Sequence, residues 1–223
     1  MKNENKTICL LYTTYHSFLW DLISHDIDQS NLVVLNFSQR PLNNIRKNKV
    51  IERSKTNKIK FLLACLAIAS KSKFHKYNLI LPHPDHLLGN TLFFNKNAQS
   101  ISLLEDGILN YYNYKQAHAI AKKSEQRRKL TRFTPFSYTI YTGHLSGVDN
   151  CPTPELYGWF TDPEQIIKKS KFKHLNKINL PASSEQPANL NNTVFLLELP
   201  LEKFLNEKTE QFIRSKTKKF IEE

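Results

Sequence analysis

Residues 7–12, Thr-Ile-Cys-Leu-Leu-Tyr, form a short run of apolar and β-branched side chains near the start of the chain. A run of this length without polar alternation is typical of a strand that is buried on both faces. Similar runs recur at residues 32–37 (LVVLNF), 77–81 (YNLIL) and 100–104 (SISLL). These stretches predict four buried strands.

Stretches with helical character separate the predicted strands. The apolar residues Phe18, Leu19, Leu22 and Ile23 form one stripe of a helix over residues 13–25. Further helices are predicted at residues 59–70, 86–94 and 118–132, the last of them strongly basic. Strands that alternate with helices in this way indicate an α/β fold with a Rossmann-like parallel sheet and flanking helices.

The pattern predicts a domain boundary near residue 180. Residues 181–192 are polar, contain two prolines and show no periodicity, which is typical of a linker. A new apolar run at residues 193–199 (TVFLLEL) and an amphipathic stretch from residue 202 onward predict the first strand and helix of another α/β domain. We therefore expect a Rossmann-like domain over residues 1–180, a linker over 181–192, and the beginning of a truncated second domain over 193–223.

The composition narrows the choice of partner and compartment. With 32 Lys and Arg against 20 Asp and Glu, the formal charge is +12, which favours nucleic acid, anionic lipid or an acidic sugar nucleotide. Only 5 of the 223 residues are glycine, so a glycine-rich phosphate loop is not expected. The three scattered cysteines are typical of buried thiols in a reducing compartment. With no signal peptide and no apolar stretch of spanning length, we expect a cytoplasmic protein.

Polar side chains follow three of the predicted strands, at the point where each strand ends. In an open parallel sheet these ends meet at one edge, where ligands bind. The residues concerned are Tyr15 and His16 after the first strand, His83 and His86 after the third, and Glu105, Asp106 and Gly107 after the fourth. We expect them to line one edge of the sheet. A metal site at His83, Asp85 and His86 is a weaker interpretation than a polar turn, and we expect no metal.

Glu105, Asp106 and Gly107 form the most informative of these three clusters. Two adjacent carboxylates after a buried strand point in different directions, so one can face a cleft while the other braces the turn. Gly107 permits the positive φ of a sharp turn. A carboxylate in a partly dry cleft can take a proton from a sugar hydroxyl. The alternative is an ordinary turn between strand and loop, in which Asp-Gly is common.

Residues 103–112, LLEDGILNYY, resemble the acidic-acidic-glycine motif of bacterial sialyltransferases. These include the polysialyltransferases of glycosyltransferase family 38, the lipooligosaccharide sialyltransferases of family 52 and, more remotely, family 80. The resemblance implies the N-terminal half of a GT-B fold. It also implies transfer of sialic acid from CMP-sialic acid to a capsule or lipooligosaccharide glycan, without metal or other cofactor.

The same resemblance implies roles for individual residues. Glu105, at the first acidic position, would be the general base that deprotonates the acceptor hydroxyl, and Asp106 would support it. Their place at the same edge of the sheet, and not the resemblance, makes Gly107, Tyr15, His16, His83 and His86 the residues expected to bind the acceptor. The alternative is an ordinary helix start for Tyr15 and His16, and a polar turn for His83 and His86.

The sequence departs from these families on the donor side. Their His-Pro motif lies in the C-terminal domain, whereas the single His-Pro here, His83-Pro84, precedes the acidic motif, so the role is not transferred. We therefore expect a truncated form that lacks most of the donor-binding half. Its catalytic activity is left open.

Two other interpretations of the sequence stay open. A non-catalytic basic module that binds nucleic acid or anionic surfaces would account for the charge and the basic helix, although we expect no specific nucleic-acid partner. A GT-B glycosyltransferase for another sugar would share the fold. In any of these cases the basic helix at residues 118–132 offers a peripheral contact with the anionic inner membrane.

Overall fold

The computed structural model describes residues 5–38, 40–43, 45–46, 49–54, 56–111, 131 and 134–180. All of them lie in the first of the two units into which the chain divides, Met1–Leu180. The predicted linker at 181–192 and the predicted second domain at 193–223 lie outside the described residues. So does the predicted basic helix at 118–132, apart from Thr131.

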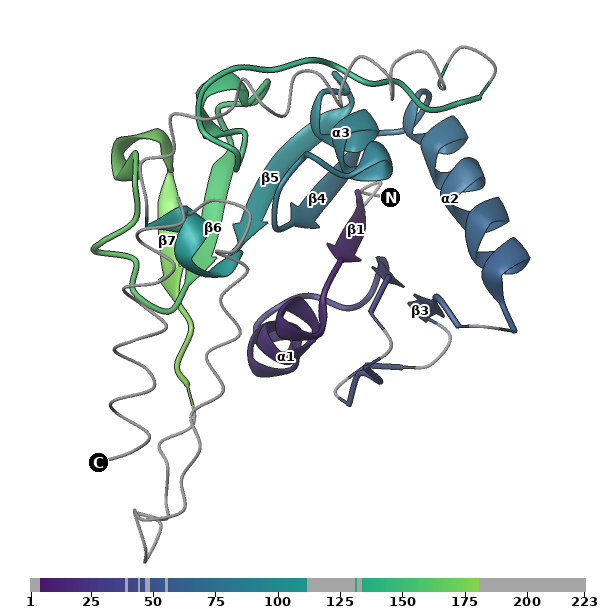
Figure 1. Ribbon diagram of the computed structural model, residues 1–223, viewed down its shortest axis with the longest axis horizontal. Coiled ribbons are helices and arrows are strands. Elements are labelled where there is room, and N and C mark those ends of the chain that lie inside the picture. The colour runs from purple at the N-terminus through teal and green to yellow at the C-terminus, as the bar shows by residue number, and fades with distance from the viewer. Residues whose placement is uncertain are drawn as a thin grey trace, which may run out of the picture. The chain divides into compact units, whose positions relative to one another are not determined.

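The described residues form a seven-stranded parallel sheet (Figure 1) with the strand order β3-β2-β1-β4-β5-β6-β7. The strands are β1 (Lys6–Leu11), β2 (Leu32–Asn36), β3 (Val50–Glu52), β4 (Tyr77–Leu81), β5 (Ala98–Leu104), β6 (Leu156–Phe160) and β7 (His174–Lys177). Cys9 at the centre of β1 pairs with Val34 of β2 on one side and with Ile80 of β4 on the other. This arrangement confirms the predicted α/β, Rossmann-like fold. The strand order reverses between β1 and β4, which makes that position the topological switch point of the sheet.

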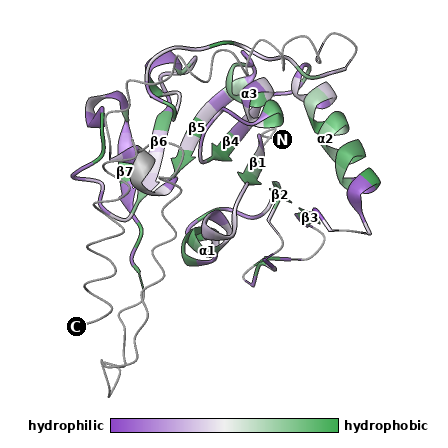
Figure 2. Cartoon of the chain, in the orientation of Figure 1, coloured by the Kyte–Doolittle hydropathy of each residue, from purple (hydrophilic) through white to green (hydrophobic). Residues whose placement is uncertain are grey.

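Alternate side chains of β1 enter two different hydrophobic cores, one on each face of the sheet. Ile8 and Leu10 pack with residues of α2 (Lys58–Ser72) and α3 (Leu87–Phe93). Cys9 and Leu11 pack with α1 (Thr14–Ile23), whose Trp20 is completely buried. Burial on both faces explains why the central strands have continuous apolar sequences. In Figure 2, β1 is coloured mainly as hydrophobic and β7, at the edge, mainly as hydrophilic.

The helices form where the apolar spacing predicts them. In α2 the buried residues Phe61, Cys65, Ile68, Ala69 and Ser72 follow each other at three- and four-residue spacing, so one stripe of the helix faces the sheet. The short α3 follows directly after the polar turn that ends β4. Three single-turn 3₁₀ helices complete the described structure: η2 (Gly107–Asn110), η3 (Val148–Asn150) and η4 (Lys169–Lys171).

The structure contains three strands that the sequence did not predict. β3 has only three residues, and β7 is an edge strand that ends in Lys177. Charged side chains at an edge discourage pairing with other sheets. β6 carries Gly158, and a Cβ at this position would collide with Phe160 and Leu175. The parallel sheet therefore continues past residue 137, where the sequence pattern is weak. No helix in the described part of the chain is long and apolar enough to cross a membrane.

Candidate functional site

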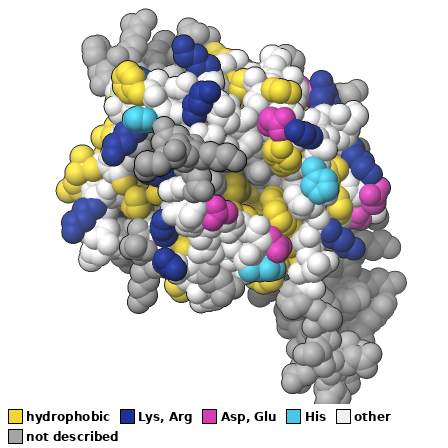
Figure 3. All heavy atoms as spheres, turned by 180° about the vertical axis from the view of Figure 1, so that it is seen from behind, with side chains coloured by type: hydrophobic (Ala, Val, Ile, Leu, Met, Phe, Trp, Pro, Cys, Tyr) yellow, Lys and Arg dark blue, Asp and Glu magenta, His cyan; other side chains and the backbone are white. Residues whose placement is uncertain are grey.

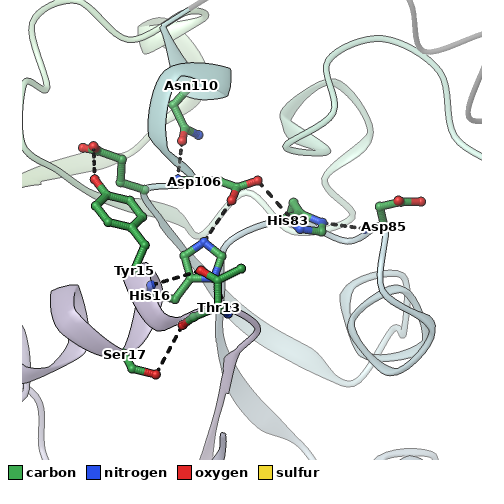
Figure 4. A network of polar contacts seen from close by, with 9 residues as sticks. Thr13, Tyr15, His16, Ser17, His83, Asp85, Asp106 and Asn110 are labelled. Atoms are coloured by element: carbon green, nitrogen blue, oxygen red, sulfur yellow. Dashed lines mark hydrogen bonds and ion pairs between the residues drawn. The ribbon is translucent and has the colours of Figure 1, made fainter. Parts of the chain in front are cut away.

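The carboxyl ends of β1, β4 and β5 lie next to one another, because β4 pairs with β1 on one side and with β5 on the other. Their last residues are Leu11, Leu81 and Leu104. The polar residues that follow these strands converge beside the switch point, as Figure 4 shows. This is the place where open α/β sheets bind ligands.

His16 is held by the first turn of α1. Thr13 is the N-cap, and its hydroxyl accepts the backbone N–H of His16 at 3.3 Å. In return, the backbone N–H of Thr13 donates to Nδ1 of His16 at 3.2 Å. This is a capping box in which a histidine replaces the usual Glu or Gln. Because Nδ1 accepts a hydrogen bond, the proton of the neutral ring is on Nε2.

His83 is held in the same way by the turn after β4. The backbone N–H of Asp85 donates to Nδ1 of His83 at 3.1 Å. This contact assigns the proton of the neutral His83 ring to Nε2 as well. Two local backbone contacts therefore fix the tautomers of both histidines, and each ring carries its proton on Nε2, the nitrogen nearest to Asp106.

Both imidazoles point to the carboxylate of Asp106 (Figure 4). Nε2 of His16 lies 2.9 Å from Oδ1 of Asp106, and Nε2 of His83 lies 3.7 Å from Oδ2. The side chain of His16 is 1% exposed, whereas that of Asp106 is 19% exposed. The carboxylate thus stays accessible while one oxygen is fixed by a buried donor. The contact from His83 to the other oxygen is too long for a direct hydrogen bond.

The backbone after Asp106 turns sharply. The N–H of Asp106 donates to Oδ1 of Asn110 in η2. Gly107 has φ +63, a conformation that favours glycine, and no atom lies within 4 Å of the position that a Cβ would occupy. Gly107 is therefore required by its backbone conformation, and the space beside it is open.

Glu105 has a different environment from its neighbour. It is only 3% exposed, and three described residues donate hydrogen bonds to its carboxylate. Tyr15 donates to Oε1 at 2.6 Å. Oε2 accepts from the hydroxyl of Tyr111 at 2.6 Å, and from the backbone N–H and hydroxyl of Thr161 at 2.6 and 2.8 Å. Glu105 therefore joins segments that follow β1, β5 and β6.

The phenols around Glu105 stay protonated. The pKa of Tyr111 is raised to about 12 by burial and by its hydrogen bond to Glu105. The pKa of Tyr15 is raised further, with burial again the larger cause and the Glu105 contact the next. Both tyrosines act as donors that hold the carboxylate in place.

The ring of Tyr12 contacts the rings of His83 and His86. Its ring stacks on His86 at a centroid distance of 4.9 Å and lies 5.0 Å from the ring of His83. Its hydroxyl is buried against Gly89 and has no hydrogen-bond partner among the described residues. The pKa of Tyr12 is raised, mainly by burial and also by the charge of Asp106. The ring of His86 also packs against that of Phe37, at a centroid distance of 4.4 Å. This predicted acceptor-binding residue therefore lies in an aromatic cluster with Tyr12 and Phe37.

The structure brings most of the predicted site residues together. Tyr15, His16, His83, Glu105 and Asp106 form one network of contacts, with Gly107 at its turn. Tyr12 stands at the end of the first predicted strand, in the polar stretch that the sequence pattern singles out together with Tyr15 and His16. Thr161 was not predicted as a site residue, because it follows β6, a strand that the sequence pattern does not predict. Within the described residues, no cluster of three or more His, Cys, Asp or Glu side chains has the geometry to hold a metal ion.

Comparisons with protein-family models, with curated proteins and with solved structures find no match to this chain. The fold and the contacts at the strand ends define the class of protein: an α/β protein with a carboxylate–histidine cluster at its switch point.

Proposed function

We propose that this chain is the acceptor-side part of a sialyltransferase-like glycosyltransferase, and that Asp106 is its general base. The observation that carries the proposal is the accessible carboxylate of Asp106, held by His16 and adjacent to His83 at the switch point. The Glu105-Asp106-Gly107 triplet, which resembles the motif of bacterial sialyltransferases, supports the sialyl assignment. The proposal concerns the acceptor side alone.

In this mechanism the acceptor hydroxyl lies at Oδ2 of Asp106. The hydroxyl oxygen attacks the anomeric carbon of CMP-sialic acid, and the bond from that carbon to the phosphate oxygen of CMP breaks. The hydroxyl proton passes to Asp106, and CMP leaves with the bonding electrons. The neutral His16 donates to Oδ1 of Asp106, and this contact orients the carboxylate so that Oδ2 faces the acceptor.

The roles of the two carboxylates are exchanged relative to what the resemblance implies. Glu105 is buried and already accepts from Tyr15, Tyr111 and Thr161, so a substrate hydroxyl would have to displace one of these donors. Asp106 needs no such displacement. We therefore assign Glu105 to positioning and Asp106 to proton transfer.

The test is transfer of sialic acid from CMP-sialic acid to lactose-type and oligosialic acceptors, with acceptor binding followed in parallel by ligand-observed NMR. We expect Asp106→Asn to abolish transfer while acceptor binding and thermal stability are largely kept. Glu105→Gln should lower transfer and thermal stability together. A wild-type chain that neither binds these acceptors nor transfers to them would overturn the proposal. Full activity of Asp106→Asn would overturn the assignment of the base.

A further inference from the structure

The outward face of α2 exposes large apolar side chains that the core does not use. Ile59, Leu62 and Leu63 are 76%, 54% and 58% exposed, and Phe74, just after the helix, is 79% exposed. The spacing of residues 59, 62 and 63, with the half-buried Leu66 one turn further, places them on one stripe. The buried stripe of α2 faces the sheet, so this second stripe faces outward.

The charged residues of α2 and of the segment directly after it are all positive. Residues 53–84 contain no Asp or Glu. The exposed cations on α2 and directly after it are Lys58, Lys60, Lys71, Lys73 and Lys76. In Figure 3 the side of the molecule that carries α2, on the left of this rear view, mixes hydrophobic and basic side chains without acidic ones. We call the set of residues 58–60, 62, 63, 71, 73, 74 and 76 the α2 surface.

A hollow with a volume of about 470 Å³ adjoins the C-terminal end of the α2 surface. Its lining includes Lys6, Lys71, Lys76, Phe74 and Tyr77. In the described part of the chain none of these three lysines forms an ion pair with a carboxylate. The pKa of Lys6 is lowered by partial burial and by the nearby charges of Lys71 and Lys49. An anionic group in the hollow would relieve this repulsion.

We infer that the α2 surface docks on an anionic lipid bilayer, with the apolar stripe at the acyl boundary and the lysines at the headgroup phosphates. An amphipathic helix with Leu, Ile and Phe on one stripe and Lys beside it is typical of helices that lie in the membrane interface. α2 differs from such a helix on its opposite stripe, which packs on the sheet and is not polar and exposed to water. The inference concerns a surface formed by residues other than those of the proposed catalytic crevice and does not depend on it.

Charge and shape argue against two other occupants. A second copy of the α2 surface would bring two sets of lysines together with no carboxylate between them, and the like charges would repel. Nucleic acid would match the lysines and could stack a base on Phe74, but Ile59, Leu62 and Leu63, which form the stripe on the helix, have no aromatic face for further bases. A bilayer with anionic headgroups matches both the charge and the aliphatic side chains.

The test is co-sedimentation of the full chain with vesicles of phosphatidylcholine alone and of phosphatidylcholine mixed with phosphatidylglycerol. We expect binding only to the mixed vesicles. Leu63→Gln with Phe74→Gln should weaken binding by roughly ten-fold per side chain. The matched control, Leu180→Gln with Ile140→Gln, alters two other exposed apolar residues and should bind as the wild type does.

A second set of variants tests the charges. Neutralising Lys58, Lys60 and Lys73 with Gln should weaken binding by about five-fold per lysine at low salt, and less at high salt. Gln at the exposed Lys169, Lys171 and Lys177 should leave binding unchanged. Circular dichroism melting confirms that each variant is folded.

Four outcomes would overturn the inference. The first is equal binding of the α2 variants and the wild type. The second is loss of binding only when the basic stretch at residues 118–132 is neutralised. The third is a stable dimer in solution that Phe74→Gln dissociates. The fourth is tryptophan emission from Phe74→Trp that shows no blue shift on addition of mixed vesicles.

Discussion

Nε2 of His16 lies 2.9 Å from Oδ1 of Asp106, although 90 residues separate them in the chain. The same histidine closes the capping box of α1 through Nδ1. The His16 ring therefore caps the N-terminus of α1 through Nδ1 and orients the Asp106 carboxylate through Nε2. The two roles can be separated by substitution.

The first prediction separates them with a glutamine. His16→Gln keeps a side-chain acceptor for the N–H of Thr13, because Gln is a normal capping-box residue at this position. We expect its thermal stability to stay close to that of the wild type while sialyl transfer falls at least ten-fold. His16→Phe loses both roles and should unfold more easily, by about 1–2 kcal/mol. Equal stabilities of these two variants would show that the capping contact contributes nothing.

The second prediction concerns the unequal burial of the two carboxylates. Glu105→Gln places an amide where two phenols and a threonine donate, so some donors lose their acceptor. We expect a loss of about 1–3 kcal/mol in the free energy of unfolding, measured by urea denaturation. Asp106→Asn, at a more exposed position, should cost less. The reverse order would contradict the bracing role of Glu105.

The third prediction concerns alkaline pH. In the folded protein the pKa of Tyr111 is raised from 10.0 to about 12, so the folded state holds this proton more strongly than the unfolded chain does. Its contribution to stability is present below pH 10 and is lost as the pH rises toward 12. Tyr111→Phe should therefore be less stable than the wild type at neutral pH, by about 1–2 kcal/mol. The difference should shrink at alkaline pH in denaturation curves measured across this range, and a constant difference would argue against the shift.

The fourth prediction concerns the turn at Gly107. Its φ of +63 is strained for alanine, although the space beside it is open. Gly107→Ala should lower the free energy of unfolding by about 1–2 kcal/mol, and Gly107→Asn should cost less because Asn adopts this conformation more readily. Thermal unfolding of both variants measures the difference. A large, equal loss in both would indicate a steric cause instead.

The sequence predicted the centre of the sheet well and its margins poorly. β1, β2 and β4 are largely apolar runs because they are buried on both faces, and β5 ends in the buried pair Leu103 and Leu104. β6 is interrupted by Gly158, and β7 ends in Lys177 at the edge, so neither carries that signal. The register of pairing between β5 and β6 depends on tertiary contacts that no local pattern contains.

The same limit applies to the site. That polar side chains after β1, β4 and β5 would share one edge followed from the parallel topology alone. Which carboxylate of the Glu105-Asp106 pair is buried could not be predicted, because it depends on Thr161 at the end of an unpredicted strand. The orientations of His16 and His83 depend on single backbone N–H groups, which sequence patterns do not encode.

The hydrogen bonds to Glu105 have a consequence for the order of folding. They reach from Glu105 to Tyr15, 90 residues away, and to Thr161, 56 residues away. Contacts across such sequence separations form slowly, because the loop entropy is lost before the contact is gained. Until β6 docks beside β5, the carboxylate lacks the donors of Thr161 that its burial requires. We therefore expect the Glu105 contacts to become ordered only after β6 has docked. A nascent chain that has emerged only as far as the Glu105-Asp106-Gly107 triplet should lack the ordered cluster.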